Sequence, residues 1–219
     1  MGSVVVVVVF LVGFLALMIF WQVRRRLRRA RAVRAWAEER GLNFDLQDPH
    51  DLYGDSRSVF SGERRRRVGN TTWGKWGTHE VLAGDLTTST RDNETHRVLS
   101  VVRVPLPFTA PAHVSVVPHD LWSRVKDKLG FEGISLPSED FNKRYDVRSD
   151  DREFAVELLD LSLIAWLLTI DRRFGLDVLG GRVVFTSEIL RPEELGKLFD
   201  AATGFVDRIP PRVLEAYPG

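Results

Sequence analysis

The sequence predicts a single N-terminal transmembrane helix followed by one α+β domain, in which two or three helices pack on a mainly antiparallel sheet. An uninterrupted apolar run lies close to the N-terminus, strand-like segments separated by prolines fill the middle of the chain, and apolar residues recur at helical spacing in its last third. Because these strands and helices do not alternate strictly along the chain, a parallel βαβ architecture is not favoured.

The predicted anchor is residues 4–21, a run of eighteen residues without a polar side chain. As a helix this run is about 27 Å long, close to the thickness of the hydrocarbon core of a bilayer. A lone span in lipid must pair every backbone N–H and C=O within itself, so helix is expected despite six consecutive valines. A cleaved signal peptide is the alternative, but positive charge before the run and small residues at a cleavage site are both missing.

The flanking charges predict the direction of the span. Only Met1, Gly2 and Ser3 precede it, whereas residues 24–34 hold seven arginines and no acid. Under the positive-inside rule the N-terminus lies outside and the domain is cytoplasmic, as in a single-pass protein of the cell membrane. The arginines serve as a stop-transfer signal, and we also expect them to contact anionic lipid headgroups of the bilayer. They are Arg24, Arg25, Arg26, Arg28, Arg29, Arg31 and Arg34.

The chain therefore divides into three predicted parts: an anchor at residues 1–23, a basic juxtamembrane helix at 24–41 and a soluble domain at 42–219. Gly41 suits the left-handed position that follows a helix end. The chain carries a net charge of +1, so without the seven arginines the remainder carries −6. A mildly acidic domain argues against a nucleic-acid partner, and the absence of cysteine excludes disulfides, thiolate nucleophiles and cysteine metal sites.

Strands are expected in the first half of the domain, after a loop at residues 45–55 that is rich in turn formers. Prolines separate the strand-like segments, and one later segment alternates apolar and polar residues with the period of a half-buried strand. The predicted strands are residues 79–87, 97–104, 113–117 and 141–147.

Helices are expected mainly in the second half of the domain. Asp150 and Glu153 have the spacing of a capping box before a long apolar periodicity, and Pro192 is placed to open the last helix. The pair Gly180 and Gly181 separates two strand-like segments and predicts a tight hairpin. The predicted helices are residues 120–129, 151–169 and 192–209.

Part of this region resembles a family of uncharacterised, N-terminally anchored membrane proteins of actinobacteria. The resemblance lies in the segment 138–159, where an FN-x-x-Y-x-V strand at 141–147 precedes an FA-x-x-LL helix at 154–159. It extends loosely to a WA-x-x-x-G turn at 36–41 and to the VRVPLP strand end at 102–107. The resemblance implies the architecture of an anchored α+β domain and no activity, because none is established for that family.

The spacing of candidate residues argues against several kinds of binding and catalytic site. Residues 69–76, GNTTWGKW, fit G-x-x-x-x-G-K but place Trp76 where a phosphate loop needs Ser or Thr, and no helix follows, so a glycine-rich turn is the favoured interpretation. No two histidines have ligand spacing, and no cofactor or metal is predicted. Ser135 lacks the closing glycine of a nucleophile elbow. Glu139, Asp140 and Asn142 either serve acid/base chemistry or are solvated, as acids before a strand ordinarily are.

A second candidate surface combines aromatic and basic residues. Trp73 and Trp76 either form an exposed platform for a partner or pack in a core or turn. A basic run lies just before them and is either solvated or turned toward the bilayer. This run is Arg64, Arg65, Arg66 and Arg67.

The leading functional hypothesis is a noncatalytic, membrane-tethered interaction module that docks protein or lipid at the cytoplasmic face. It follows from the anchor, the basic flank and the lack of a catalytic pattern. The alternative is a membrane-associated hydrolase whose Asp, Glu, Ser or His residues are brought together only by the fold.

Overall fold

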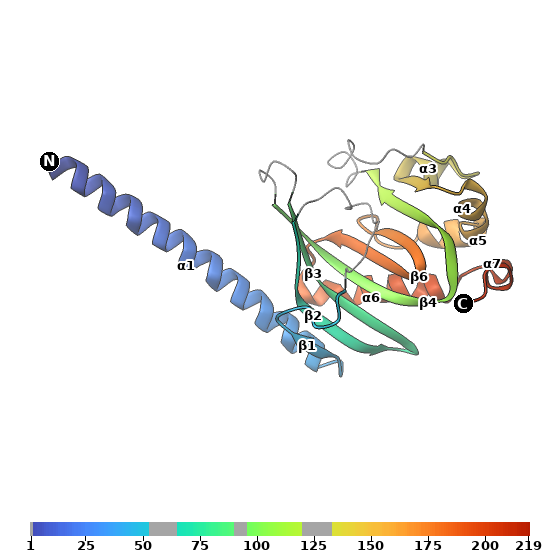
Figure 1. Cartoon of the computed structure of the whole chain (residues 1–219), viewed down its shortest axis with the longest axis horizontal. Helices are drawn as coiled ribbons and strands as arrows, with labels where there is room; N and C mark the ends of the chain where they lie inside the picture. The colour runs from blue at the N-terminus through green and yellow to red at the C-terminus, as the bar shows by residue number, and fades with distance from the viewer. Residues whose placement is uncertain (1, 53–64, 90–95, 120–132) are drawn as a thin grey trace.

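The computed structural model describes residues 2–52, 65–89, 96–119 and 133–219, although the side chains of residues 2–12, 65, 66, 89 and 96 are not described. The predicted helix at 120–129 and Arg64 therefore lie outside the described residues. The fold consists of a long N-terminal helix and an α+β domain built on an antiparallel sheet (Figure 1). The predicted fold class is confirmed for the domain.

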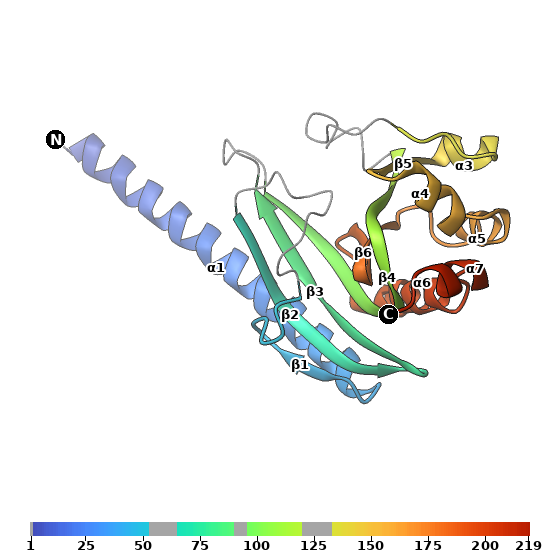
Figure 2. The same ribbon diagram turned by 45° about the vertical axis from the view of Figure 1, so that its right-hand side comes forward.

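The sheet has six strands in the order β1-β2-β3-β4-β5, with β6 paired to β4 outside this path. The long, bent β4 is its centre: β6 runs along it for most of its length, β3 pairs with its first half and β5 with its second half. Figure 2 shows the bend of β4, with α3 to α7 gathered at the right and α1 running at the left beside β1 and β2. The strands are β1 (Asn43–Asp45), β2 (Arg65–Trp76), β3 (His79–Ser89), β4 (His96–Pro118), β5 (Tyr145–Ser149) and β6 (Gly175–Glu188).

The helices cover one face of this sheet. Helix α6 packs across β4 and β6, and the last turns of α1 lie against β1 and β2. The helices are α1 (Gly2–Glu38), α3 (Glu139–Arg144), α4 (Arg152–Leu158), α5 (Leu161–Leu167), the 3-10 turn η1 (Pro192–Glu194), α6 (Leu195–Val206) and α7 (Pro211–Ala216).

Apolar side chains are buried on both faces of the sheet. Alternation along β3 places Val81 and Ala83 in the main core under the helices, and Leu82 and Leu86 in a smaller cluster on the opposite face. The main core contributes most of the hydrophobic stabilisation, because it contains every fully buried phenylalanine among the residues that the structure describes. The smaller cluster is Leu52, Leu82, Leu86, Leu99, Val101, Val117 and Val184.

The predicted strand at 79–87 is confirmed, but the separation of 97–104 from 113–117 is wrong, since both belong to β4. Proline lacks a backbone N–H, yet Pro105 and Pro107 lie where the register with β6 shifts, between Pro105 and Ala110. The hydrogen-bond ladder between β4 and β6 therefore accommodates both prolines at this irregularity in its register.

The predicted hairpin at Gly180 and Gly181 is also wrong. Residues on both sides of these glycines pair with β4, so β6 is one continuous strand, and Gly180 takes a φ of +54° where the register shifts. The predicted turn at 69–76 is likewise part of a strand, β2, whose bulge between Gly69 and Thr72 includes Asn70 at a φ of +50°.

One strand prediction and one helix prediction are corrected by local capping. Residues 141–144 are helical rather than extended, because the Ser138 side chain caps α3 by accepting from the N–H of Phe141. The long helix expected at 151–169 is two helices, since Asp160 accepts from the N–H of Leu163 at 2.8 Å and starts α5 anew.

The ends of the terminal helices agree with the sequence more closely. Helix α1 ends at Glu38, and Gly41 takes a φ of +70°, which confirms its left-handed position. Pro192 opens η1 and α6 as predicted, and Pro211 starts the unpredicted short helix α7.

Candidate functional site at the junction of helix and domain

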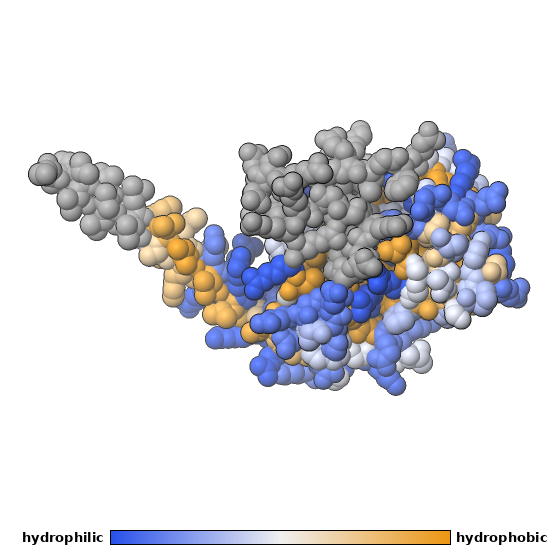
Figure 3. Space-filling view, viewed as in Figure 1, coloured by the Kyte–Doolittle hydropathy of each residue, from blue (hydrophilic) through white to orange (hydrophobic). Residues whose placement is uncertain are grey.

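The described part of α1 presents an apolar surface on all sides before it reaches the domain. Consecutive residues point around the whole helix, and eight large apolar side chains between positions 14 and 23 are 47–65% exposed. Figure 3 shows them as an orange band along α1. Where side chains are described, from Gly13 onward in this helix, no helix has the length and apolar character needed to cross a membrane. The eight residues are Phe14, Leu15, Leu17, Met18, Ile19, Phe20, Trp21 and Val23.

The last turns of α1 are part of the domain core. Ala30, Val33, Trp36 and Ala37 are at most 7% exposed, and their spacing puts them on one face of the helix. The Trp36 ring stacks on Trp76 of β2 at 5.9 Å between centroids and tilts against Phe199 of α6 at 5.2 Å, so aromatic contacts join α1 to both layers of the domain. The helix and domain therefore share one packed interior.

A partly buried ion pair fixes the helix where it leaves the domain. The Nε and Nη2 atoms of Arg29 each donate to one carboxylate oxygen of Asp85 at 2.6 Å, and its Nη1 donates to the carbonyl of Leu190 at 2.7 Å. The amide of Asn70, in the β2 bulge, also donates to Asp85 at 2.8 Å. This fork geometry sets the rotation and the height of α1 on the sheet.

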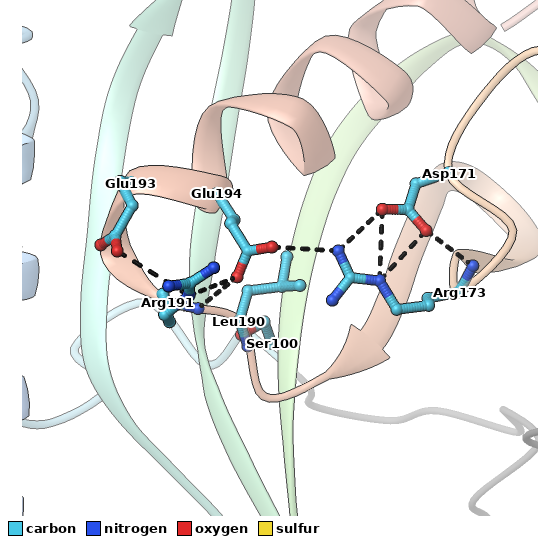
Figure 4. Close-up of polar contacts among 7 residues, drawn as sticks. All are labelled: Ser100, Asp171, Arg173, Leu190, Arg191, Glu193 and Glu194. Carbon is cyan, nitrogen blue, oxygen red and sulfur yellow. Dashed lines mark hydrogen bonds and ion pairs between the residues drawn. The ribbon is translucent and has the colours of Figure 1, made fainter.

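The Leu190 carbonyl is itself held in place (Figure 4). The backbone N–H of Leu190 donates to the Ser100 hydroxyl at 3.0 Å. The neighbouring Arg173 pairs with Asp171 at 2.7 Å and Glu194 at 3.1 Å, and its hydrogen bonds lower the pKa of both carboxyls. The turn that receives Arg29 is thus braced from two sides.

The seven arginines of the basic flank separate into two groups. Arg29 is half-buried and bound to Asp85, so it faces the domain rather than the solvent. Arg34 is exposed and pairs with Glu38 one turn later at 2.8 Å. The exposed members are Arg24, Arg25, Arg26, Arg28, Arg31 and Arg34.

The aromatic and basic residues of β2 occupy different surroundings. Trp76 is half-buried in the core, and its Nε1 donates to Asp200 at 2.8 Å. Of the two interpretations of this residue, an exposed platform or a packed side chain, the structure therefore supports the packed side chain. Trp73 is half-buried on the opposite face against His50, with ring centroids 4.6 Å apart. Arg67 is exposed, while Arg65 and Arg66 belong to β2 without described side chains.

The polar residues around Glu139 brace a loop. The amide of Asn142 accepts from the N–H of Leu136 at 3.0 Å and donates to the carbonyl of the same residue at 2.6 Å. Glu139 is exposed and pairs with Lys143.

In the described part of the chain, no group of three or more histidine, aspartate or glutamate residues is placed to hold a metal ion.

Sequence reasoning missed a buried pair on the face opposite the helices. The Nε2 atom of His113 on β4 lies 2.8 Å from Oδ1 of Asp177 on β6, and the two side chains are 9% and 4% exposed. The alternation HVSVV already indicated that His113 and Ser115 share a face, but nothing local connects them to Asp177. The Ser115 hydroxyl is buried without a hydrogen bond, so the described side chains do not join it to the histidine.

This pair predicts a stability change at neutral to alkaline pH. Burial lowers the pKa of His113, but the hydrogen bond and charge of Asp177, with the charge of Asp150, outweigh burial and raise it. A raised folded-state pKa stabilises the protein below the unfolded value of about 6.5, and this contribution is lost as pH rises through the folded value. Urea unfolding should show the stability of the native chain falling as pH rises above about 6.5, and a flatter profile in His113→Gln; parallel profiles would contradict the assignment.

Comparison with known proteins supports the fold. No family model and no curated protein sequence matches the chain. Among solved structures, the mycobacterial trehalose monomycolate transport factor A aligns with a TM-score of 0.65 over 86% of this chain and 96% of that chain. The two proteins share a fold. Their sequence identity is 14%, so the likeness extends to the architecture alone.

Proposed function

We propose that the chain is a membrane-tethered, noncatalytic docking module in which residues 4–21 cross the bilayer and α1 holds the domain against the membrane surface. The observation that carries this proposal is the apolar surface around α1 between Phe14 and Val23, which lies one to two turns before the half-buried Arg29 that fixes the helix to the domain. A helix that exposes large apolar side chains on every side is unfavourable in water and favourable in lipid. The uncharged stretch at 4–12 extends the same surface in sequence.

The exposed arginines support the direction of the anchor. Six arginines follow the apolar run and remain exposed, which favours their retention on the cytoplasmic side and their contact with anionic headgroups. Arg29 is left out of this contact because Asp85 and Leu190 already bind its guanidinium. The domain is therefore cytoplasmic, and the N-terminus lies outside.

A docking role also fits the fold neighbour, which is described as a factor for trehalose monomycolate transport. By analogy of fold alone, the domain is an accessory that positions a protein or lipid partner beside a membrane transport process. Membership of the N-terminally anchored actinobacterial proteins is part of the same proposal. The hydrolase alternative has less support, since His113 and Asp177 are buried against each other.

The topology is tested with reporters fused to the C-terminus. Green fluorescent protein fluoresces when it folds in the cytoplasm, whereas alkaline phosphatase is active only outside it. The proposal therefore predicts that a C-terminal fusion to green fluorescent protein is fluorescent and that a C-terminal fusion to alkaline phosphatase is inactive. Moving Arg24, Arg25 and Arg26 to positions before Val4 should shift part of the population to the opposite orientation. An active phosphatase fusion of the native chain would overturn the proposed orientation.

A further inference from the structure

The contact between Arg29 and Asp85 places Arg29 of α1 beside Asp85 of β3, and this contact is the reference level for the residues described next. Asp85 pairs with Gly69 of β2 on one side and with Ser100 of β4 on the other. From this level α1 rises about 8 Å to Arg24 at 1.5 Å per residue. Two further residues along each strand add about 7 Å, which carries the next row of the sheet toward the side on which α1 leaves the domain.

That next row consists of Arg67, Thr87 and Val98, which are paired across β2, β3 and β4. Each lies two residues from Gly69, Asp85 or Ser100, so alternation places the row on the face against which α1 docks. Figures 1 and 2 show these strand ends directed to the same side as the N-terminal end of α1. Ile189 adjoins the row, because it follows Glu188, the partner of Leu99.

The exposure of this row fits a bilayer interface. Val98 and Ile189 are both 41% exposed, although they are β-branched apolar residues at the edge of a core. Arg67 is exposed, and Leu27 of α1, between the exposed arginines, is 49% exposed. The row itself contains no carboxylate, and Asp85 below it is neutralised by Arg29. Apolar side chains beside an arginine are the composition that inserts into the headgroup boundary of an anionic bilayer.

We infer that Arg67, Thr87, Val98 and Ile189, here called the shoulder, form a second membrane contact that rests on the bilayer surface. This inference depends on the proposed insertion of α1. Because α1 is packed and ion-paired to the sheet, insertion of the helix brings the shoulder to the headgroups without a hinge. Arg67 then binds lipid phosphate, Val98 and Ile189 enter the interface, and the domain has one orientation on the membrane.

Spin-label depth measurement tests this inference. The chain has no cysteine, so Leu15→Cys, Val98→Cys and Leu161→Cys each give one labelling site. Leu161 is an apolar control, 65% exposed on α5 at the far end of the domain (Figure 1). The full chain is placed in nanodiscs of equal phosphatidylglycerol and phosphatidylcholine, and the accessibility of each label to oxygen and to a nickel chelate is compared.

The expected order is a label in hydrocarbon at position 15, a label at the interface at position 98 and a label in water at position 161. A label at 98 that matches the label at 161, with position 15 in hydrocarbon, would overturn the shoulder and leave the anchor intact. A label in water at position 15 would overturn the anchor and the shoulder together.

Charge reversal provides a second test. Adding Arg67→Glu to the Val98→Cys chain should raise nickel accessibility at position 98 severalfold, because the carboxylate repels anionic headgroups. Lys75→Glu is the matched control, since Lys75 is exposed near the opposite end of β2. Equal accessibility in the two variants would contradict the contact between Arg67 and the membrane.

Discussion

Replacing Trp36 by alanine should lower the free energy of unfolding of the domain by about 3–5 kcal/mol, the cost of removing a large buried aromatic side chain. Trp36 is 5% exposed and contacts Trp76 and Phe199, so its removal leaves a cavity between α1, the sheet and α6. Urea unfolding of the full chain in detergent micelles, followed by circular dichroism, measures the change.

Trp21→Ala is the matched control for this prediction. Trp21 lies on the same helix but is 64% exposed and touches none of the domain core, so its removal should change the stability of the domain by less than about 0.5 kcal/mol. Equal losses in the two variants would show that the last turns of α1 are not part of the domain.

Removing the carboxylate of Asp85 should also lower the free energy of unfolding of the domain by a large amount. Asp85→Ala leaves the Arg29 guanidinium without its bidentate partner, and we expect a loss of about 2–4 kcal/mol, somewhat below a fully buried pair. The discount reflects the exposure of the two side chains, 22% for Arg29 and 11% for Asp85. A double-mutant cycle with Arg29→Ala isolates the coupling between them, which should exceed about 1 kcal/mol.

The control is the ion pair between Arg34 and Glu38 on the same helix. Both side chains are more than half exposed, so Glu38→Ala should cost far less stability than Asp85→Ala. A coupling between Arg29 and Asp85 as small as that surface pair would mean that the ion pair does not fix the helix to the sheet.

Features determined by local chemistry could be predicted from the sequence. The left-handed Gly41 after α1, the strand at β3 and the proline that opens α6 each depend on a few neighbouring residues. The helix break at Asp160 also has a local cause, since an aspartate there can cap a new helix, but the apolar periodicity on both sides concealed it.

Features determined by distant pairing could not be predicted in the same way. Pro105 and Gly180 each look like the end of a strand, yet β4 and β6 run alongside each other past both positions. A strand that gains a continuous partner is stabilised through an irregularity that local propensity would treat as a turn.

The candidate site shows the same division. The basic flank was visible in the sequence, but the separate role of Arg29 depends on Asp85, which lies 56 residues later. A signal did exist, because Arg29, Val33 and Trp36 are spaced four and three residues apart, which places the arginine on the stripe that enters the core.

The most direct test of the membrane-tethered account is fractionation of cells that produce the full chain, with a carbonate wash of the membranes. The account predicts that the intact chain stays in the membrane pellet after the wash, because an inserted helix is not released by alkaline salt. Recovery of the intact chain in the soluble fraction, or of a chain cleaved after residue 21 and exported, would contradict it.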